Sequence, residues 1–186
     1  MDNPAYSPEV QALHDGGVIA YPTEAVFGFG CDPDNEFAVQ RILAIKQRPV
    51  EKGLILIADN YSQLIKYVDD KRIPIDKRAD IFSRWPGSTT WLLPAAPSTP
   101  KWLTGQFDSI AVRVTTHPTV KRICNEFGNA IVSTSANRAG EEPVTSADQA
   151  IALFGNEVNM VVNESVGSNS QPSQIVCATS GKIIRN

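Results

Sequence analysis

The sequence predicts a single α/β domain in which helices flank a mixed β-sheet. Short apolar runs that are typical of buried strands alternate with segments whose apolar residues recur at helical spacing. A length of 186 residues and a hydrophobic content of 42% are sufficient for one domain with a substantial core. No repeat and no long linker divides the chain, so we expect residues 1–186 to form one domain.

Capping residues and the spacing of apolar side chains predict the helices. Residues 7–9, Ser-Pro-Glu, offer an N-cap, a proline at the first helical position and an early acid, and glycines at positions 16 and 17 provide a stop. Ser146 and Gln149 match a capping box at the start of another helix. The helices are expected at residues 8–15, 38–45, 61–68, 75–82, 117–127 and 146–154.

Runs of aliphatic and β-branched residues between turn residues predict the strands. They are expected at residues 18–21, 54–58, 89–94, 110–114, 130–133, 158–162, 175–178 and 182–185. Residues 27–31, Phe-Gly-Phe-Gly-Cys, are expected to be a turn, or a loop whose glycines let the backbone approach a ligand. This segment is not a GxGxxG fingerprint, and the chain has no P-loop motif.

Positive charge is concentrated in one short segment of an otherwise acidic chain. The chain carries 17 Lys and Arg against 20 Asp and Glu, a formal net charge of -3. This balance argues against a protein that binds nucleic acid over its whole surface. Arg41, Lys46, Arg48 and Lys52 nevertheless share one segment with a single acid, Glu51. We therefore expect any anion to bind at a confined site.

The sequence shows no sign of a targeting segment, a disulfide framework or a metal site. The first four residues have neither a basic start nor an apolar core, and no run approaches the roughly 18 apolar residues of a membrane span. A cytoplasmic protein without a membrane partner is therefore expected. Cys31, Cys124 and Cys177 are widely spaced and form no CxxC pair, so buried free thiols are expected. The two isolated histidines give no basis for a metal site.

Polar residues follow predicted strands at four junctions, which is where ligands usually bind in α/β sheets. At the first, Tyr-Pro-Thr-Glu at residues 21–24 adds a hydroxyl and a carboxylate to the end of a strand, although a simple turn is an equal alternative. Glu24 could be a base or a structural carboxylate that pairs with a cation. At the second, Lys46, Arg48 and Lys52 follow a helix, where a solvated helix end is the alternative.

The other two junctions combine small or hydroxyl side chains with an arginine or an amide. Ser109, Ala111 and Arg113 share one face of a strand, and a guanidinium on such a face suits a carboxylate or phosphate. A surface salt bridge would explain Arg113 equally well. Residues 133–137, Ser-Thr-Ser-Ala-Asn, gather hydroxyls, an amide and backbone N–H groups that can bind phosphate oxygens. No histidine is near in sequence, so these serines are expected to be binders and not nucleophiles.

Considered together, these junctions resemble the YrdC family, and in particular its short bacterial threonylcarbamoyl-AMP synthases. The motifs that carry the resemblance appear in the family's order and span about four-fifths of the chain. They are Tyr-Pro-Thr-Glu at residues 21–24, Lys-Gln-Arg-Pro at 46–49, Ala-Val-Arg-Val at 111–114, Ser-Thr-Ser-Ala-Asn at 133–137 and Pro-Ser-Gln-Ile at 172–175.

The resemblance implies one YrdC-like domain, an open twisted mixed sheet flanked by helices with a basic concave cavity. It implies that the chain forms threonylcarbamoyl-AMP and pyrophosphate from L-threonine, bicarbonate or CO2, and ATP. In the family this product serves N6-threonylcarbamoyladenosine modification of tRNA, with other proteins transferring the group. Mg²⁺ would be bound mainly through the ATP phosphates, without a dedicated protein cage.

The resemblance also assigns site residues by their matching positions. Lys46 and Arg48 would be catalytic, through positioning and charge neutralisation. L-Threonine would be bound by Thr23, Arg113, Ser133 and Ser173. ATP would be bound by Arg48, Lys52, Ser109, Ser135, Asn137, Pro143 and Arg185. Lys52 departs from the family pattern, because many members have asparagine at that position.

Two alternatives remain at this point. An RNA-binding or ribosome-maturation module would use the basic cavity for tRNA or duplex RNA, but the net charge is negative and no aromatic residues interleave the basic segment. Carbamoyl adenylation for metallocentre maturation is carried out by related domains in much larger proteins. The expected lack of flanking zinc-finger or acylphosphatase-like segments disfavours that role.

Overall fold

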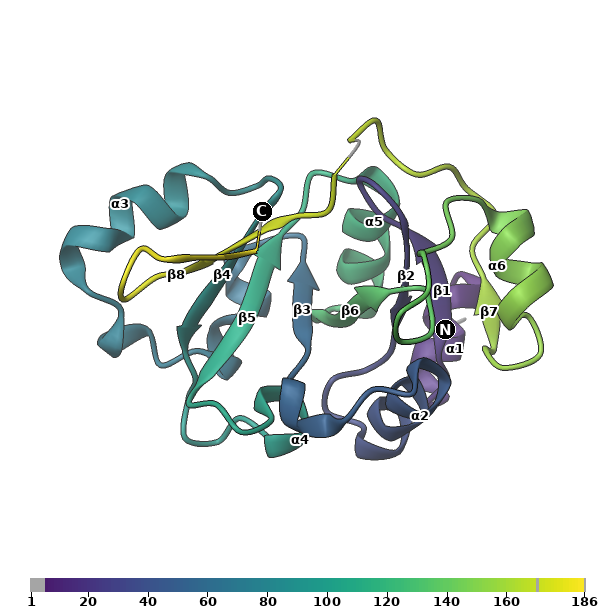
Figure 1. The fold of residues 1–186 in the computed structure, drawn as a ribbon, viewed down its shortest axis with the longest axis horizontal. Coiled ribbons are helices and arrows are strands. Elements are labelled where there is room, and N and C mark those ends of the chain that lie inside the picture. The colour runs from purple at the N-terminus through teal and green to yellow at the C-terminus, as the bar shows by residue number, and fades with distance from the viewer. Residues whose placement is uncertain (1–5, 170, 186) are drawn as a thin grey trace, which may run out of the picture.

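The computed structural model of the chain describes residues 6–169 and 171–185, and within them nine strands form one sheet (Figure 1). The strands are β1 (Ile19–Pro22), β2 (Phe27–Gly30), β3 (Ile55–Ala58), β4 (Thr89–Pro94), β5 (Ser109–Val114), β6 (Ile131–Ser135), β7 (Met160–Val161), β8 (Gln174–Cys177) and β9 (Ile183–Arg185). Their order across the sheet is β7-β1-β2-β6-β3-β5-β4-β8-β9.

The sheet is mixed, as the sequence predicts. β7 is parallel to β1, β5 to β3 and β8 to β4, whereas the other neighbours are antiparallel. In this register Ile55 of β3 lies between Ala111 of β5 and Ser133 of β6, and Leu92 of β4 is opposite Ala111. Because residues directly opposite each other share a face of the sheet, these four side chains form one row.

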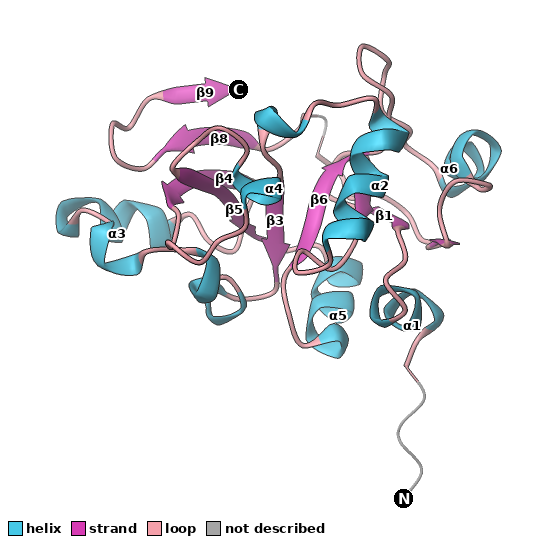
Figure 2. Ribbon diagram, turned by 90° about the horizontal axis from the view of Figure 1, so that it is seen from below, coloured by secondary structure: helices cyan, strands magenta, loops and turns pink. Residues whose placement is uncertain are grey.

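Six α-helices lie within the described residues, together with short 3₁₀ turns. The helices are α1 (Pro8–His14), α2 (Glu36–Lys46), α3 (Ile75–Ser83), α4 (Lys101–Thr104), α5 (Pro118–Phe127) and α6 (Ala147–Phe154). One core cluster joins α1 and α5 to β1, β3 and β6, and Figure 2 shows these two helices next to each other. A larger cluster packs α2 and α6 with the side chains on the other face of the central strands.

Local sequence signals set the ends of α2 and so position the basic segment. Asn35 caps the helix by accepting a hydrogen bond from the Ala38 N–H at 3.1 Å. The helix ends after Lys46, where Gln47 adopts a left-handed conformation with φ 53°. This turn leads directly to Arg48 and the 3₁₀ turn Val50–Lys52.

The prediction of an α-helix at residues 61–68 is wrong. The segment forms two separate 3₁₀ turns, Tyr61–Gln63 and Ile65–Tyr67. Leu64 and Tyr67 are both buried, and their spacing of three residues matches the repeat of a 3₁₀ helix. In a 3₁₀ helix these two side chains point in the same direction, so burying both of them favours 3₁₀ turns over an α-helix.

The turn expected at residues 27–31 is not formed, because most of this segment is β2. At Gly30 the glycine is required by the neighbouring strand and not by a turn. A Cβ atom at Gly30 would lie 2.7 Å from Cε1 of Tyr21 and 3.0 Å from the carbonyl oxygen of Val132. Tyr21 is fully buried over this strand, which leaves no room for a larger residue.

Two predicted helix caps form only in part. Ser7 precedes α1, but its hydroxyl donates to Glu126 at 2.9 Å and makes no capping bond, because α5 lies against this end of α1. Ser146 does cap α6, accepting from the Gln149 N–H at 3.3 Å. The Gln149 side chain accepts from the backbone of Thr145 instead of Ser146, so the reciprocal half of the box is absent.

The remaining expectations about helices and strands agree with the structure to within about two residues, apart from the short α4, which had no sequence signal. Cys31 and Cys124 are buried free thiols, whereas Cys177 is only half-buried. Among the described residues, no helix combines the length and apolar character that spanning a membrane would require.

Candidate functional site

A cavity of about 470 Å³ lies over the row of side chains formed by the central strands. The ends of β1, β5 and β6, the turn after α2 and the β8–β9 hairpin all contribute to its lining. The predicted site residues that line it are Thr23, Arg48, Lys52, Ser109, Arg113, Ser133, Ser135, Pro143, Ser173 and Arg185. The five sequence motifs therefore meet at one place, although they are spread along most of the chain.

The lining is strongly cationic. Arg48, Arg113 and Arg185 all border the cavity, and Glu24 is the one acidic residue among the described lining residues. Partial burial lowers the pKa of Arg185, and the neighbouring charges of Arg113 and Arg48 lower it further. Burial also lowers the pKa of Arg48. Arg185 is thus in the field of two other guanidinium groups, and an anion in the cavity would offset this charge.

Arg113 is held by a buried acid. Its Nη1 lies 3.0 Å from Oε2 of Glu24, and the two side chains are only 8% and 9% exposed. The second oxygen of Glu24, Oε1, accepts a hydrogen bond from the Thr115 hydroxyl at 2.6 Å. Nε of Arg113 is buried and has no hydrogen-bond partner. Glu24 thus has the structural role that the sequence left as one of two alternatives.

Ser173 and Arg185 meet across the β8–β9 hairpin. Nη2 of Arg185 donates to the carbonyl oxygen of Ser173 at 2.9 Å and lies 3.3 Å from its hydroxyl oxygen. The same hydroxyl is 2.9 Å from that of Thr90 on β4. These contacts fix the Ser173 hydroxyl at the wall of the cavity, beside a cation.

Lys46 lies behind the lining and holds the loop that follows β6. Its Nζ donates to the carbonyl oxygens of Ser135 and Asn137 and to the Asn137 side chain, the last two at 3.0 Å. Lys46 is only 4% exposed. Burial, followed by the charge of Arg48, lowers the pKa of Lys46 to about 8. Three acceptors on one loop use all three donors of the ammonium group.

Asn137 is likewise engaged within its own loop. Its Oδ1 accepts from the Ser135 hydroxyl at 2.6 Å, and its Nδ2 donates to the carbonyl oxygens of Arg138 and Glu141. Among the predicted site residues, Lys46 and Asn137 are the two that do not line the cavity. Their contacts shape the backbone that presents Ser133 and Ser135 to it.

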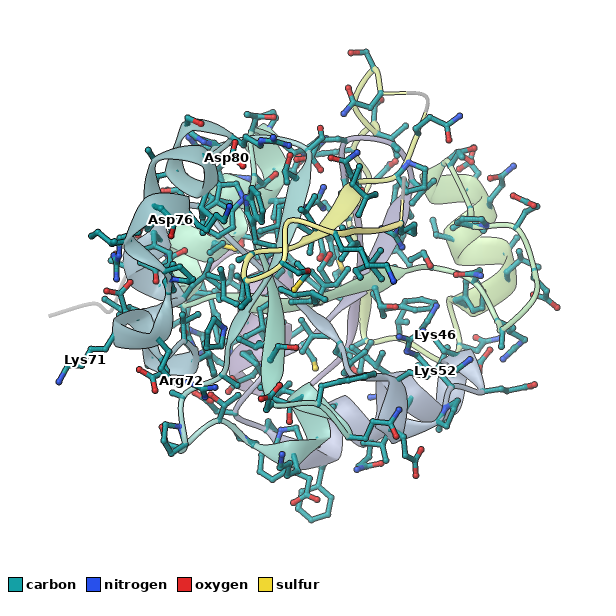
Figure 3. The ribbon with its side chains drawn as sticks, turned by 60° about the vertical axis from the view of Figure 1, so that its left-hand side comes forward. Lys46, Lys52, Lys71, Arg72, Asp76 and Asp80 are labelled. Carbon is teal, nitrogen blue, oxygen red and sulfur yellow. The ribbon has the colours of Figure 1, made fainter. Side chains whose placement is uncertain are left out.

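Arg48 and Lys52 line the cavity from the turn after α2. Nη2 of Arg48 donates to the Gly53 carbonyl oxygen at 3.0 Å, and its buried Nε has no hydrogen-bond partner. Lys52 is exposed and makes no ion pair within the described residues. In Figure 3, Lys46 and Lys52 lie on one side of the molecule and the charged residues Lys71, Arg72, Asp76 and Asp80 around α3 lie on the other.

Sequence reasoning missed several lining residues. Asn169 belongs to a segment that crosses the end of β1, and its Nδ2 donates to the Ser88 hydroxyl at 2.7 Å. An apolar wall is made by Leu92, Leu103, Phe107, Ile175 and Ile184. Thr115, which does not line the cavity but supports Glu24 from behind it, was also missed. Alternation along the strand would have found Thr115, since it is two residues after Arg113 and continues the face of Ser109, Ala111 and Arg113.

The donor set of the cavity does not provide a protein cage for a metal ion. Among the residues that the structure describes, no three or more His, Cys, Asp or Glu side chains are grouped in a way that could hold one. Glu24, the one acid of the lining, is already engaged by Arg113 and Thr115. A divalent cation in this cavity would have to arrive on a ligand that supplies its own oxygen atoms.

Comparison with known proteins identifies the family. The family model Sua5_yciO_yrdC, described as "Telomere recombination", matches residues 11–186. The chain belongs to the Sua5/YciO/YrdC family. The resemblance drawn from the five motifs is therefore confirmed.

Relatives within the Sua5/YciO/YrdC family align along almost the whole chain. A threonylcarbamoyl-AMP synthase of Pseudoalteromonas translucida (strain TAC 125) is 61% identical over 184 residues, which cover 99% of this chain and 98% of that protein. Another from Yersinia enterocolitica is 52% identical over 181 residues, covering 97% and 95%. The single-domain α/β fold matches E. coli YciO with a TM-score of 0.81 at 23% identity, covering 96% of this chain and 86% of that one.

A solved structure of the family contains an amino acid. P. abyssi Sua5 complexed with L-threonine has a TM-score of 0.85 and 27% identity to this chain, and the match covers 94% of this chain and 51% of Sua5. The Sua5/YciO/YrdC fold of this chain thus corresponds to about half of that longer protein.

Proposed function

We propose that this chain is a threonylcarbamoyl-AMP synthase that forms threonylcarbamoyl-AMP and pyrophosphate from L-threonine, bicarbonate or CO2, and ATP. The observation that carries the proposal is the convergence of Arg48, Arg113 and Arg185 on one cavity of about 470 Å³. Two of the substrates present anionic groups that must be held together, the carboxylate of L-threonine and the triphosphate of ATP. The family relatives that bear this name match the chain over nearly their full lengths.

L-Threonine would be bound at the buried end of the cavity. Arg113 lines the cavity, its Nη1 is paired with Glu24 and its Nε has no hydrogen-bond partner, and it would bind the carboxylate. Thr23, Ser133 and Ser173 surround this end with hydroxyl groups. They would orient the amine and the side-chain hydroxyl of the amino acid.

ATP would be bound between Arg48 and Lys52 on one side and the apolar wall on the other. Arg48, Lys52 and Arg185 would neutralise the phosphates, and Ser109 and Ser135 would donate hydrogen bonds. Pro143 lines the same region and would contribute packing and its carbonyl group. The adenine ring requires an apolar surface, which Leu103 and its neighbours in the apolar wall would supply.

The chemistry proposed here needs positioning and charge neutralisation, with no covalent enzyme intermediate. The threonine amine takes up CO2 and loses a proton, giving a carbamate. A carbamate oxygen then attacks the α-phosphorus of ATP while the bond to pyrophosphate breaks. Arg48, which lines the cavity, would offset the charge that develops on the phosphates. Mg²⁺, when bound by the ATP phosphates, would add to this neutralisation.

Lys46 and Asn137 would act on this reaction from behind the lining. Lys46 fixes the backbone of the loop after β6 at three acceptors, and Asn137 ties Ser135 to the same loop. Their contribution would be to hold Ser133 and Ser135 in the geometry that both substrates need. This role differs from direct contact with phosphate, which the family pattern suggested for Asn137.

The product would serve N6-threonylcarbamoyladenosine formation in tRNA, in the cytoplasm, with other proteins carrying out the transfer. A primary role in binding tRNA or duplex RNA is the alternative. The synthase and the RNA-binding module are distinguished by the ligand that each should bind. A synthase should bind L-threonine in the cavity, whereas an RNA-binding module should bind duplex RNA tightly at physiological salt whether or not threonine is present.

The proposal is tested by following label from bicarbonate. Purified protein, ATP, Mg²⁺ and radiolabelled bicarbonate should yield a labelled adenylate that separates from ATP by chromatography, but only when L-threonine is added. Arg48→Ala should reduce this yield, and Lys71→Ala, on the far side of the molecule in Figure 3, should not. Label in an adenylate without any amino acid would contradict the proposed reaction.

A further inference from the structure

A buried chain of polar side chains connects Thr115, the residue after β5, to Arg113 of that strand through Glu24 in the turn after β1. The Thr115 hydroxyl lies 2.6 Å from Oε1 of Glu24, and Oε2 of Glu24 lies 3.0 Å from Nη1 of Arg113. Thr115 is fully buried and does not line the cavity. It is therefore one side chain removed from the group proposed to bind the amino acid carboxylate.

The direction of the hydrogen bond from Thr115 is set by its surroundings. The backbone N–H of His117 donates to the Thr115 hydroxyl oxygen at 3.0 Å. A hydroxyl has a single proton, and the carboxylate of Glu24 is the acceptor within reach. The proton of Thr115 is thus committed to Glu24, and the contact is a charge-assisted hydrogen bond away from solvent.

The backbone around Glu24 is held independently of Thr115. The N–H of Gly167 donates to the Thr23 carbonyl oxygen at 2.9 Å, and the N–H of Asn169 donates to that of Glu24 at 3.1 Å. A Cβ atom at Gly167 would lie 2.8 Å from the Glu24 carbonyl oxygen, so the two segments are in close contact. What the backbone does not fix is the rotation of the Glu24 carboxylate, which depends on its side-chain partners.

Arg113 depends in turn on Glu24. Within the described part of the chain, Glu24 is the one acid paired with Arg113, and Nε of Arg113 is buried without a hydrogen-bond partner. A long side chain with one anchor is oriented by that anchor. A rotated Glu24 carboxylate would therefore move the guanidinium group relative to the cavity.

We infer that Thr115 is a positioning residue for recognition of the amino acid substrate, acting through Glu24 on Arg113. The inference rests on the proposed function, in which Arg113 binds the carboxylate of L-threonine. Its specific content is that loss of the Thr115 hydroxyl weakens binding of threonine and leaves binding of ATP unchanged. A merely structural role for Thr115 would lower the stability of the fold and would not separate the two substrates.

The first test compares steady-state kinetics of Thr115→Val, which preserves shape, with those of Thr115→Ser, which preserves the hydroxyl. Thr115→Val should raise KM for L-threonine on the order of tenfold, because one hydrogen bond to a charged group is lost. KM for ATP should stay within about twofold of its value in the unmodified protein. Thr115→Ser should retain the unmodified KM values. If Thr115→Val does not fold, Thr115→Ala replaces it with the same expectation.

Thr119→Val is the matched control. Thr119 is also buried, and its hydroxyl also donates to a carboxylate, that of Glu164, but it does not line or support the cavity. Thr119→Val should leave KM for threonine unchanged. An equal rise of KM for threonine in both valine variants would overturn the inference, because it would show a general effect of losing a buried hydroxyl.

A double-mutant cycle tests whether Thr115 acts through Glu24. Glu24→Gln alone should raise KM for threonine, and adding Thr115→Val should raise it no further, because the two changes break the same chain. Additive effects, or an unchanged KM in Thr115→Val, would overturn the inference while leaving the proposed function intact. Absence of threonine-dependent turnover in the unmodified protein would overturn both.

Discussion

Replacing Arg113 by methionine should affect stability and threonine recognition through two separable causes. Arg113 and Glu24 form an ion pair with both side chains less than a tenth exposed. Removing only the arginine leaves the Glu24 carboxylate buried and unpaired, which should lower the free energy of unfolding by about 3–5 kcal/mol. The same change removes the proposed carboxylate ligand. The loss of about 3 kcal/mol of charge-assisted binding would reduce kcat/KM for threonine on the order of a hundredfold.

Adding Glu24→Gln to Arg113→Met separates these two effects. The glutamine amide carries no charge and can still accept the hydrogen bond of Thr115, so the double variant should regain most of the lost stability. It should not regain threonine recognition, because the guanidinium group is still absent. Urea unfolding measures the stability, and pyrophosphate release at varied threonine concentration measures recognition.

The reasoning would be refuted by either of two results. If Arg113→Met lowers the free energy of unfolding by less than about 1 kcal/mol, the ion pair is not buried in solution as the structure shows. If the double variant recovers normal kcat/KM for threonine, Arg113 does not bind the substrate and serves only to neutralise Glu24.

Three further changes test other parts of the structure. If Arg48 contacts a phosphate, Arg48→Ala should cost at least about 2 kcal/mol of transition-state stabilisation, measured as the fall in kcat/KM for ATP. Full activity in this variant would show that Arg48 is not part of the site. Lys46 has its pKa lowered from 10.5 to about 8 in the folded protein, so the unfolded chain binds more protons between these values. As the pH rises from about 8 to 10.5, the free energy of unfolding of the unmodified protein should therefore rise relative to that of Lys46→Met, as measured by urea unfolding. Activity should fall over the same range, because the Lys46 ammonium loses its proton. If the difference in free energy of unfolding between the two proteins does not change with pH, the prediction is contradicted. Gly30→Ala should destabilise the fold by about 1–3 kcal/mol, because its Cβ atom would meet Tyr21 and the backbone of β6, and unchanged thermal unfolding would show that the strands can adjust.

Elements whose signals are local could be predicted from the sequence, whereas elements set by distant neighbours could not. α5 begins beside its proline and ends at Gly128, which adopts φ 78°, and both signals lie within the helix or next to it. β2 was missed because its glycines have no local meaning. Gly30 is explained by the Tyr21 ring on the neighbouring strand.

The same distinction applies to the site. The motifs predicted which residues would gather at the cavity, because each motif carries its own hydroxyl, amide or cation. They did not predict that Lys46 would turn away from the lining, since its partners Ser135 and Asn137 are 89 and 91 positions away in sequence. Thr115 has no motif of its own, and its relation to Arg113 depends on Glu24, which is 91 positions from Thr115.

The most direct test of the proposed activity is the dependence of pyrophosphate release on both small substrates. With ATP and Mg²⁺ present, the purified protein should release pyrophosphate only when L-threonine and bicarbonate are supplied together. Pyrophosphate release at the same rate without threonine would contradict the account, since the cavity would then hydrolyse or adenylate something other than the threonine carbamate.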